Sequence, residues 1–180
     1  MNSFIAFLRG VNISGKNRVA MPELKAALEE AGFTGVATYL NSGNVLLSSE
    51  GDAVSVRAAV ESVLAARFGI SVPAHVIGRE ELEDILAHAP AWWGAGDKRA
   101  YDNLIFILTG DAPADICALA GPPSEGLESI QVYNRVIFWS FDRSRYQQCA
   151  WWKSTARAGL AERLTSRTAG TLRKVCGLGR

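Results

Sequence analysis

The order of apolar segments in the first 89 residues constrains the fold of this chain more than any other feature. Short apolar runs that suit buried strands alternate with stretches whose apolar residues recur at helical spacing. We predict strands over residues 4–8, 36–40, 45–47 and 70–77. One helix, over residues 22–31, follows the first strand, and a second, over 52–68, follows the third. This order is that of the split β-α-β, or ferredoxin-like, unit. Because its crossovers are right-handed, we expect the first and third strands to lie side by side and antiparallel at the centre of the sheet.

The second half of the chain repeats much of this order. We expect an N-terminal half over residues 1–89 that ends in a short helix, a linker over 90–102 and a second half over 103–180. In the second half, we predict a strand over residues 103–110, a helix over 114–120 and a hairpin over 127–141. Three short helices follow, over residues 143–154, 159–164 and 171–176. The predicted fold class is therefore α+β: two ferredoxin-like halves with antiparallel sheets, the second a β-α-β-β-α half with a helical C-terminal extension. A decayed internal duplication would explain the likeness, and it requires an antiparallel hairpin in the second half.

Composition places the chain among ordinary globular proteins. Apolar residues make up 48% of its 180 residues and charged residues 21%. No run approaches the roughly 18 apolar residues that cross a bilayer, and the first residues do not resemble a signal peptide. Cys117, Cys149 and Cys176 form no CxxC pair, which argues against a disulfide framework or a zinc site and favours a reducing cytoplasm. Neither His75 nor His88 has partners at metal-ligand spacing, so we expect no metal and no cofactor.

The loop after the first strand is the best candidate for a binding site. It spans residues 9–18 and holds three cations, two asparagines and two glycines. If the first and third strands are antiparallel neighbours, this loop and the turn between the second and third strands meet at one edge of the sheet. Eight polar residues would then converge: Arg9, Asn12, Lys16, Asn17, Arg18, Asn41, Ser42 and Asn44. Cations and amides of this kind suit a small anionic or nucleotide-like ligand.

Other interpretations of this loop stay open. The asparagines could instead hold turns through side-chain to backbone hydrogen bonds. Gly10-x-x-x-x-Gly15-Lys16 matches part of a phosphate-binding loop, but Asn17 stands where that motif needs a hydroxyl for magnesium. A plain connection between strand and helix is therefore favoured over a nucleoside triphosphatase. The loop offers no carboxylate or histidine as a general base, so an enzyme of unidentified chemistry is a further hypothesis only.

Positive charge gathers in the C-terminal part of the chain. Residues 142–180 carry nine Lys or Arg against two Asp or Glu, whereas residues 1–141 carry ten against sixteen. This basic tail can dock on the acidic body of its own chain, which we favour, or attract a polyanion. The five tryptophans are Trp92, Trp93, Trp139, Trp151 and Trp152. They would pack in a core or stack on nucleobases, so nucleic-acid binding is the alternative function, and no membrane partner is expected.

Three segments carry a resemblance to a known family. They are Phe7-Leu8-Arg9-Gly10-Val11-Asn12-Ile13-Ser14-Gly15-Lys16-Asn17, Met21-Pro22-Glu23-Leu24 and Leu40-Asn41-Ser42-Gly43-Asn44-Val45. They look like the signature of an uncharacterised bacterial family catalogued as domain of unknown function 1697, to which residues 96–99 and 104–108 are also similar. The family's Thr-x-Arg-Asn-Trp-Asn-Thr run is matched here by residues 165–171, which lack its Asn-Trp-Asn centre. The resemblance implies an α+β fold of two ferredoxin-like halves and implies no activity.

Overall fold

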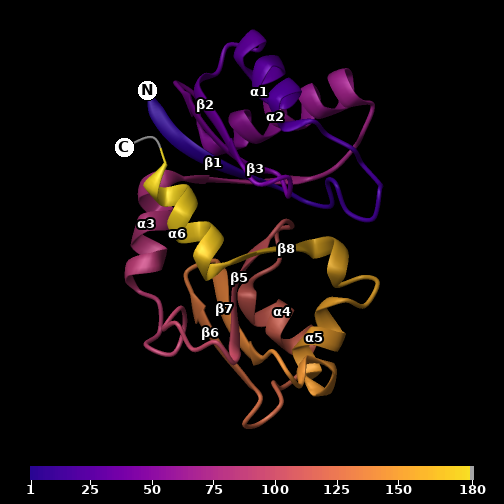
Figure 1. Ribbon diagram of the computed structural model, residues 1–180, viewed down its shortest axis with the longest axis vertical. Helices are drawn as coiled ribbons and strands as arrows, with labels where there is room; N and C mark the ends of the chain where they lie inside the picture. Colours follow the sequence, from indigo (N-terminus) through magenta and orange to yellow (C-terminus); the bar gives the residue numbers. More distant parts are fainter. Residues whose placement is uncertain (179–180) are drawn as a thin grey trace. The chain divides into compact units, whose positions relative to one another are not determined.

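The structure is a computed structural model that describes residues 1–178. The chain divides into two compact units. Unit 1 consists of Met1–Glu83 together with the described residues from Lys174 onward, and unit 2 consists of Asp84–Arg173. The division falls inside two helices, α3 (Arg79–Ala87) and α6 (Ala169–Gly177). Each unit is α+β, as predicted, and each contains, within the described residues, a four-stranded antiparallel sheet (Figure 1).

Unit 1 has the predicted ferredoxin-like order. Its elements are β1 (Asn2–Leu8), α1 (Met21–Glu30), β2 (Thr34–Tyr39), β3 (Asn44–Ser49), α2 (Ala53–Phe68) and β4 (Ala74–Gly78). The strands lie in the order β2-β3-β1-β4, and β1 is antiparallel to both of its neighbours. The central antiparallel pair of first and third strands is therefore confirmed.

The ends of α1 and α2 follow from their sequences. Pro22 stands in the first turn of α1, where a missing N–H is tolerated and the fixed φ of proline suits a helix. A capping box starts α2: Asp52 Oδ1 accepts a hydrogen bond from Ser55 N at 2.8 Å, and Ser55 Oγ accepts one from Asp52 N at 3.0 Å. Gly69 ends α2 in the left-handed conformation, with φ 65°. The cap expected at Asp52 and the stop expected at Gly69 are both confirmed.

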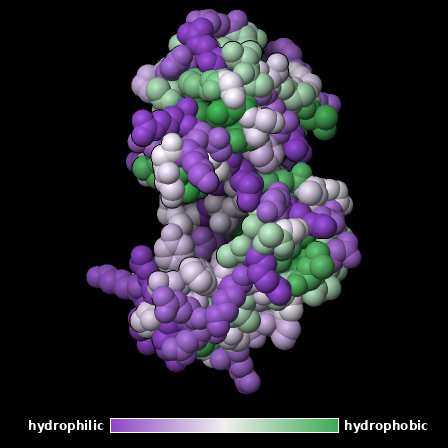
Figure 2. Space-filling view, turned by 90° about the vertical axis from the view of Figure 1, so that its right-hand side faces the viewer, coloured by the Kyte–Doolittle hydropathy of each residue, from purple (hydrophilic) through white to green (hydrophobic). Residues whose placement is uncertain are grey.

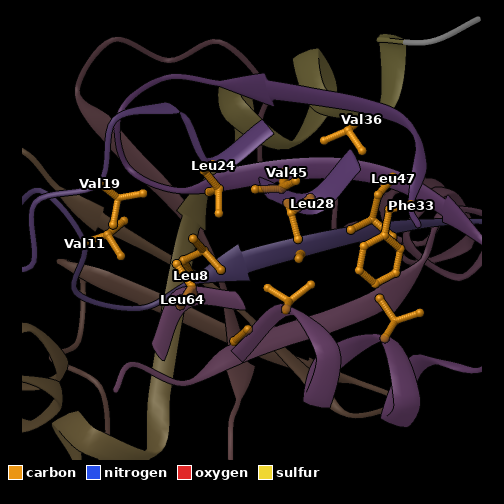
Figure 3. Packing of buried hydrophobic residues seen from close by; sticks show 14 of the residues in the cluster. Leu8, Val11, Val19, Leu24, Leu28, Phe33, Val36, Val45, Leu47 and Leu64 are labelled. Atoms are coloured by element: carbon orange, nitrogen blue, oxygen red, sulfur yellow. The ribbon is translucent and has the colours of Figure 1, made fainter. Parts of the chain in front are cut away.

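The core of unit 1 lies between one face of its sheet and the helices α1 and α2 (Figure 3). Leu28 of α1 and Leu64 of α2 are fully buried in it. Burial of a side chain of this size stabilises the fold by about 1.5–3 kcal/mol. Val11 and Val19, on the loop after β1, are also buried, and Figure 3 shows both at one end of the cluster with Leu8. The loop is therefore attached to the core at two points.

Unit 2 repeats the same topology. Its elements, besides parts of α3 and α6, are β5 (Ala100–Ile107), α4 (Pro113–Ala120), β6 (Glu128–Tyr133), β7 (Val136–Asp142), η1 (Tyr146–Gln148), α5 (Ala150–Thr155), η2 (Ala161–Arg163) and β8 (Leu164–Thr168). The strands lie in the order β6-β7-β5-β8, which is the order of unit 1 with β5 in the place of β1. The hairpin of β6 and β7 is antiparallel, as an internal duplication requires.

The sequence prediction is wrong for residues 159–164. It expects a helix there, whereas the structure has the short 3₁₀ turn η2, which leads directly into strand β8. This strand pairs antiparallel with β5, from Ile107↔Leu164 to Asn103↔Thr168. The segment Leu-Thr-Ser-Arg-Thr has no apolar alternation, so the main-chain pairing with β5 decides its conformation. Unit 2 is therefore β-α-β-β-α-β rather than the predicted β-α-β-β-α.

The helix expected over residues 143–154 also differs in the structure. It is split into η1 and α5 by Cys149, whose backbone is extended with φ −76° and ψ 127°. Before η1 the chain turns around Asp142, whose Oδ1 accepts hydrogen bonds from Ser144 N at 2.9 Å and Arg145 N at 3.2 Å. A carboxylate that caps a turn in this way competes with the helix that propensity alone would predict. The helix expected over residues 171–176 lies within α6.

The surface is of mixed character. No helix within residues 1–178 is long and apolar enough to cross a membrane. The face shown in Figure 2 has hydrophilic residues with smaller groups of hydrophobic residues among them. Exposed large hydrophobic side chains of unit 1 include Ile13 and Leu40, both of which lie on connections between elements.

Candidate functional site

The loop after β1 and the turn between β2 and β3 meet at one edge of the sheet of unit 1. In the register of β1 and β3, Phe7 lies opposite Asn44. One residue further along β1, Leu8 N donates a hydrogen bond to Gly43 O at 2.8 Å. Arg9 N then donates to Pro73 O, just before β4, at 3.0 Å. The predicted meeting of these two polar segments is therefore confirmed.

Gly43 allows this close approach. Its φ is 80°, in the left-handed region that favours glycine. A Cβ atom at this position would lie 2.7 Å from Leu8 Cβ and 2.7 Å from Val11 Cγ2. The turn can therefore contact the end of β1 only if residue 43 has no side chain.

Asn12 holds the loop in place. Its Nδ2 donates to Val19 O at 2.9 Å and to Asn41 O at 2.8 Å, and its Oδ1 accepts from Val19 N at 2.9 Å. One side chain thus joins the two ends of the loop to each other and to the β2–β3 turn. The structural role proposed for the asparagines is confirmed at this position.

The middle of the loop folds on itself. Asn12 N donates to Asn17 O at 3.0 Å, Lys16 N donates to Ile13 O at 2.9 Å, and Asn17 Nδ2 donates to Gly10 O at 2.9 Å. Asn12, Asn17 and Gly10 all have left-handed backbones, with φ of 55°, 47° and 70°. Asparagine and glycine adopt this conformation more readily than other residues, which explains their abundance in the loop.

Asn44 has a comparable role in the β2–β3 turn. Its side chain is fully buried, and its Nδ2 donates to Tyr39 O at 2.8 Å and to Ser42 Oγ at 3.1 Å. Both bonds lie within the turn that connects the two strands. Both N–H donors of this buried amide are therefore satisfied.

A pocket of about 660 Å³ opens beside the loop. We call it the α1 pocket, because the first turn of α1 forms part of its wall together with the loop, the β2–β3 turn and the end of α2. Its lining includes the side chains of Asn12, Arg18, Met21, Glu23, Asn41 and Phe68. Its volume lies in the range of pockets that hold small-molecule ligands.

The charges of the α1 pocket are unequal. The Arg18 guanidinium is exposed and has no ion-pair partner within residues 1–178. Glu23, by contrast, has an ion-pair partner on α2: its Oε1 lies 3.1 Å from Arg67 Nε. Arg67 Nη1 also lies 3.8 Å from Glu30 Oε2. The cation without a partner is therefore the one on the loop.

The eight residues predicted as ligand-binding divide into two groups. Asn12, Arg18 and Asn41 line the α1 pocket. The others are not part of its wall: Arg9, Lys16, Asn17, Ser42 and Asn44. Sequence reasoning also missed seven residues that line it: Gly15, Val19, Ala20, Met21, Pro22, Glu23 and Phe68.

The missed residues follow from the topology. The strand β4 is antiparallel to β1, so it starts at the edge of the sheet where β1 ends. The helix α2 leads into β4, and its last residue, Phe68, therefore lies at the same edge as the loop after β1. The predicted order of elements contained this information, but the prediction considered only polar side chains of the loop and of the β2–β3 turn.

The phosphate-binding-loop pattern does not have the structure of such a loop. Lys16 is followed by four further loop residues before α1 starts at Met21, and Ile13 forms an isolated bridge with Lys16. The sheet is antiparallel, whereas triphosphatases with this motif are built on a parallel sheet. The expected plain connection between strand and helix is confirmed.

The tryptophans are mainly structural. Among the residues that the structure describes, Trp93, Trp139 and Trp151 are buried and Trp92 is half-buried. Trp152 is 39% exposed. The packing interpretation is therefore confirmed for the three buried side chains.

Part of the basic tail pairs with carboxylates of its own unit. Arg163 Nη1 lies 3.1 Å from Asp111 Oδ1, and Arg145 Nη2 lies 2.9 Å from Asp142 Oδ2. Burial lowers the pKa of Arg167 to about 10, so this guanidinium is still protonated at neutral pH. Of the two carboxylates, Asp111 belongs to residues 1–141, the acidic part of the chain, and Asp142 belongs to the basic tail itself.

Within residues 1–178, no group of three or more His, Cys, Asp or Glu side chains is placed to hold a metal ion. Cys117, Cys149 and Cys176 are free thiols. Burial raises the pKa of the Cys117 and Cys149 thiols, which makes both less reactive than an ordinary cysteine.

Comparison with known proteins decides the family. The sequence pattern of a family described as "Protein of unknown function (DUF1697)" matches residues 1–138, which include every residue of the α1 pocket. The chain belongs to this family. The DUF1697 chain is also similar in structure to the conserved bacterial protein SP0830 from Streptococcus pneumoniae, with 25% identity and a TM-score of 0.84. That match covers 98% of this chain and 97% of the other, and no curated protein matches the chain.

Proposed function

We propose that this DUF1697 protein binds a small anionic ligand in the α1 pocket. The observation that carries the proposal is a cavity of about 660 Å³ with an exposed cation, Arg18, that has no ion-pair partner within residues 1–178. A ligand with a phosphate or carboxylate group would supply that partner through charge-assisted hydrogen bonds. The three free cysteines support a reducing compartment, so we place the protein in the cytoplasm.

The rigidity of the walls supports this proposal. Asn12 joins the loop to the β2–β3 turn, and Gly43 permits close packing of that turn against Leu8. Groups held in this way need little further ordering when a ligand binds, which lowers the entropic cost of association. The hydrogen bonds of Asn12, Asn17 and Asn44 therefore serve binding indirectly, as a scaffold.

The local electrostatics also favour an anion. The first turn of α1 lines the pocket, and its N-cap residue, Ala20, offers no side-chain hydrogen bond. The N-terminus of a helix carries a partial positive charge that favours anions. Arg9 and Lys16 lie on the same loop outside the pocket wall, and in this proposal they raise the local concentration of anions.

Binding measurements on the full chain test the proposal. Isothermal titration calorimetry would compare inorganic phosphate, a dicarboxylate, sugar phosphates and nucleotides. We expect at least one phosphate or carboxylate compound to bind, and Arg18→Ala to weaken it about tenfold or more, because a hydrogen bond to a charged group contributes roughly 1.5–3 kcal/mol.

The matched control is Lys25→Ala, which removes one positive charge from an exposed position on α1 outside the pocket. It should leave affinity nearly unchanged. Equal losses in Arg18→Ala and Lys25→Ala would mean that only net charge matters, and the pocket would no longer be needed. Absence of binding by every anion in the panel would remove the proposal.

Nucleic-acid binding through the C-terminal region is a second candidate, favoured by one observation. Trp152 is partly exposed and packs edge-on against Tyr146, with ring centroids 4.8 Å apart, and Lys153 follows it in the chain. Exposed aromatic rings beside cations can stack on unpaired bases. If this candidate is correct, single-stranded RNA binds at low salt, and Trp152→Ala weakens it.

A further inference from the structure

The α1 pocket has an apolar side as well as a charged side. Phe68, the last residue of α2, is partly buried against the core cluster of unit 1 and also lines the pocket. Its position is fixed by the end of the helix, where Gly69 N donates to Ala65 O at 3.1 Å. Met21 and Pro22 of α1 add further apolar wall. Arg18 and Asn41 supply the polar part of the lining.

An inorganic ion would use only the charged side of this cavity. This open surface pocket of about 660 Å³ has room for a larger molecule that also contacts the apolar wall. An aromatic side chain in such a wall favours a flat ring, since rings stack or pack edge to face. A ligand that matches both sides therefore carries an anionic group and an aromatic heterocycle.

Glu23 limits how much negative charge the ligand can carry. Its carboxylate lines the pocket and is paired with Arg67 Nε at 3.1 Å. A carboxylate accepts hydrogen bonds from hydroxyl or amino groups, and it repels a second anionic group. The side chain therefore favours a ligand with one phosphate and several hydroxyl or N–H donors over a polyphosphate.

We infer that the ligand of the α1 pocket is a nucleoside monophosphate. The phosphate pairs with Arg18, the base lies against Phe68, and Glu23 accepts a hydrogen bond from the ribose or the base. This inference rests on the proposed function, because it identifies the class of anion that the same pocket takes.

The test is a ligand series measured by calorimetry on the full chain and two variants. The ligands are inorganic phosphate, ribose 5-phosphate, the four common nucleoside monophosphates and one nucleoside triphosphate. We expect at least one monophosphate to bind about tenfold or more tightly than ribose 5-phosphate, which is the scale of one base–aromatic stack. It should also bind more tightly than the triphosphate with the same base.

Phe68→Leu should remove the advantage of the nucleotide over ribose 5-phosphate, measured as the ratio of the two affinities in the same variant. Phe68→Tyr keeps the ring and should preserve the advantage. If Phe68→Leu does not fold, Phe68→Tyr and the ligand series on the natural chain still decide the question.

Two kinds of failure can be told apart. Equal affinity for ribose 5-phosphate and the nucleotides would overturn the inference about the ring while the anion-binding proposal stands. A nucleotide advantage that persists in Phe68→Leu would also overturn it. Lack of binding by any phosphate or carboxylate compound would overturn the proposed function itself.

Discussion

At the scale of single residues, the edge of unit 1 depends on a few side chains that fix the backbone. Asn12 makes three hydrogen bonds to main-chain atoms of Val19 and Asn41. Each such bond contributes roughly 0.5–1.5 kcal/mol net, and a left-handed backbone costs asparagine less than most residues. Residues of this kind fix the shape of the loop edge through the main chain.

Gly43→Ala should destabilise the protein by about 2–4 kcal/mol, through the cost of a left-handed alanine and of overpacking. The cause is a φ of 80° and two atoms, Leu8 Cβ and Val11 Cγ2, 2.7 Å from the new Cβ. Gly32→Ala is the control, because φ at Gly32 is also left-handed, at 94°, and a Cβ added there would have nothing within 4 Å. Urea denaturation of both variants separates the steric contribution from the backbone contribution. Equal losses would contradict the close packing at Gly43.

Asp142 should make stability depend on pH. The Ser144 hydroxyl, which donates to Oδ1 at 2.6 Å, and the Arg145 guanidinium hold the pKa of Asp142 well below its usual range. A carboxyl whose pKa is lower in the folded state stabilises the protein at pH values above its unfolded pKa, about 3.9. This stabilisation is lost as pH falls further, through the folded pKa.

Asp142→Asn should therefore lower the free energy of unfolding at pH 7. The difference between the variant and the natural chain should shrink as pH falls below about 4, where the carboxyl of the unfolded chain becomes protonated. Denaturant titrations at pH 7, 5 and 3 measure this. A difference that stays constant over the three pH values would show that the charge of Asp142 is not involved.

At the scale of elements, the N-terminus of α5 in unit 2 is capped by a side chain from the strand β6. The helix α5 follows Cys149, which supplies no side-chain cap. Glu128 on β6 takes that role: its Oε1 accepts from Trp151 N at 3.1 Å and its Oε2 from Ser124 N at 2.9 Å. Trp139 Nε1 donates to the same carboxylate at 3.3 Å. No local sequence pattern predicts a contact between residues so far apart in the chain.

Glu128→Gln should destabilise the protein by about 1–3 kcal/mol, because an amide leaves one buried N–H donor without its acceptor and removes the charge at the helix start. Glu125→Gln removes the same charge at an exposed neighbouring position and should change stability by less than about 0.5 kcal/mol. Thermal and urea unfolding measure both. A loss in Glu125→Gln as large as that in Glu128→Gln would point to net charge rather than the cap.

The elements that sequence could predict were those with strong periodicity or clear end signals. The helix α2 has both, from the Asp52 cap to Gly69. The strand β8 has neither, because its five residues include one apolar side chain and its conformation comes from pairing with β5. In the pocket, Arg18 and Asn41 could be predicted from strand order, whereas Phe68 required the path of α2 to be followed to the same edge.

At the scale of the whole molecule, the two units share one strand order although their sequences have diverged. The polar loop after the first strand has no close counterpart in unit 2, where Gly110 and Asp111 lead almost directly to α4 at Pro113. The first unit has kept or gained a long connection at this edge, and the second has a short one. The pocket to which we assign the proposed ligand lies beside the longer of these two connections.

The late position of β8 in the chain bears on biosynthesis. Until residues 164–168 leave the ribosome, β5 has a partner on one side only, and its other edge presents unpaired N–H and C=O groups. Such an edge can recruit strands of neighbouring nascent polypeptides. Premature termination upstream of Leu164 therefore yields a product prone to coaggregation, and residues 164–168 protect the fold more than their polar composition would indicate.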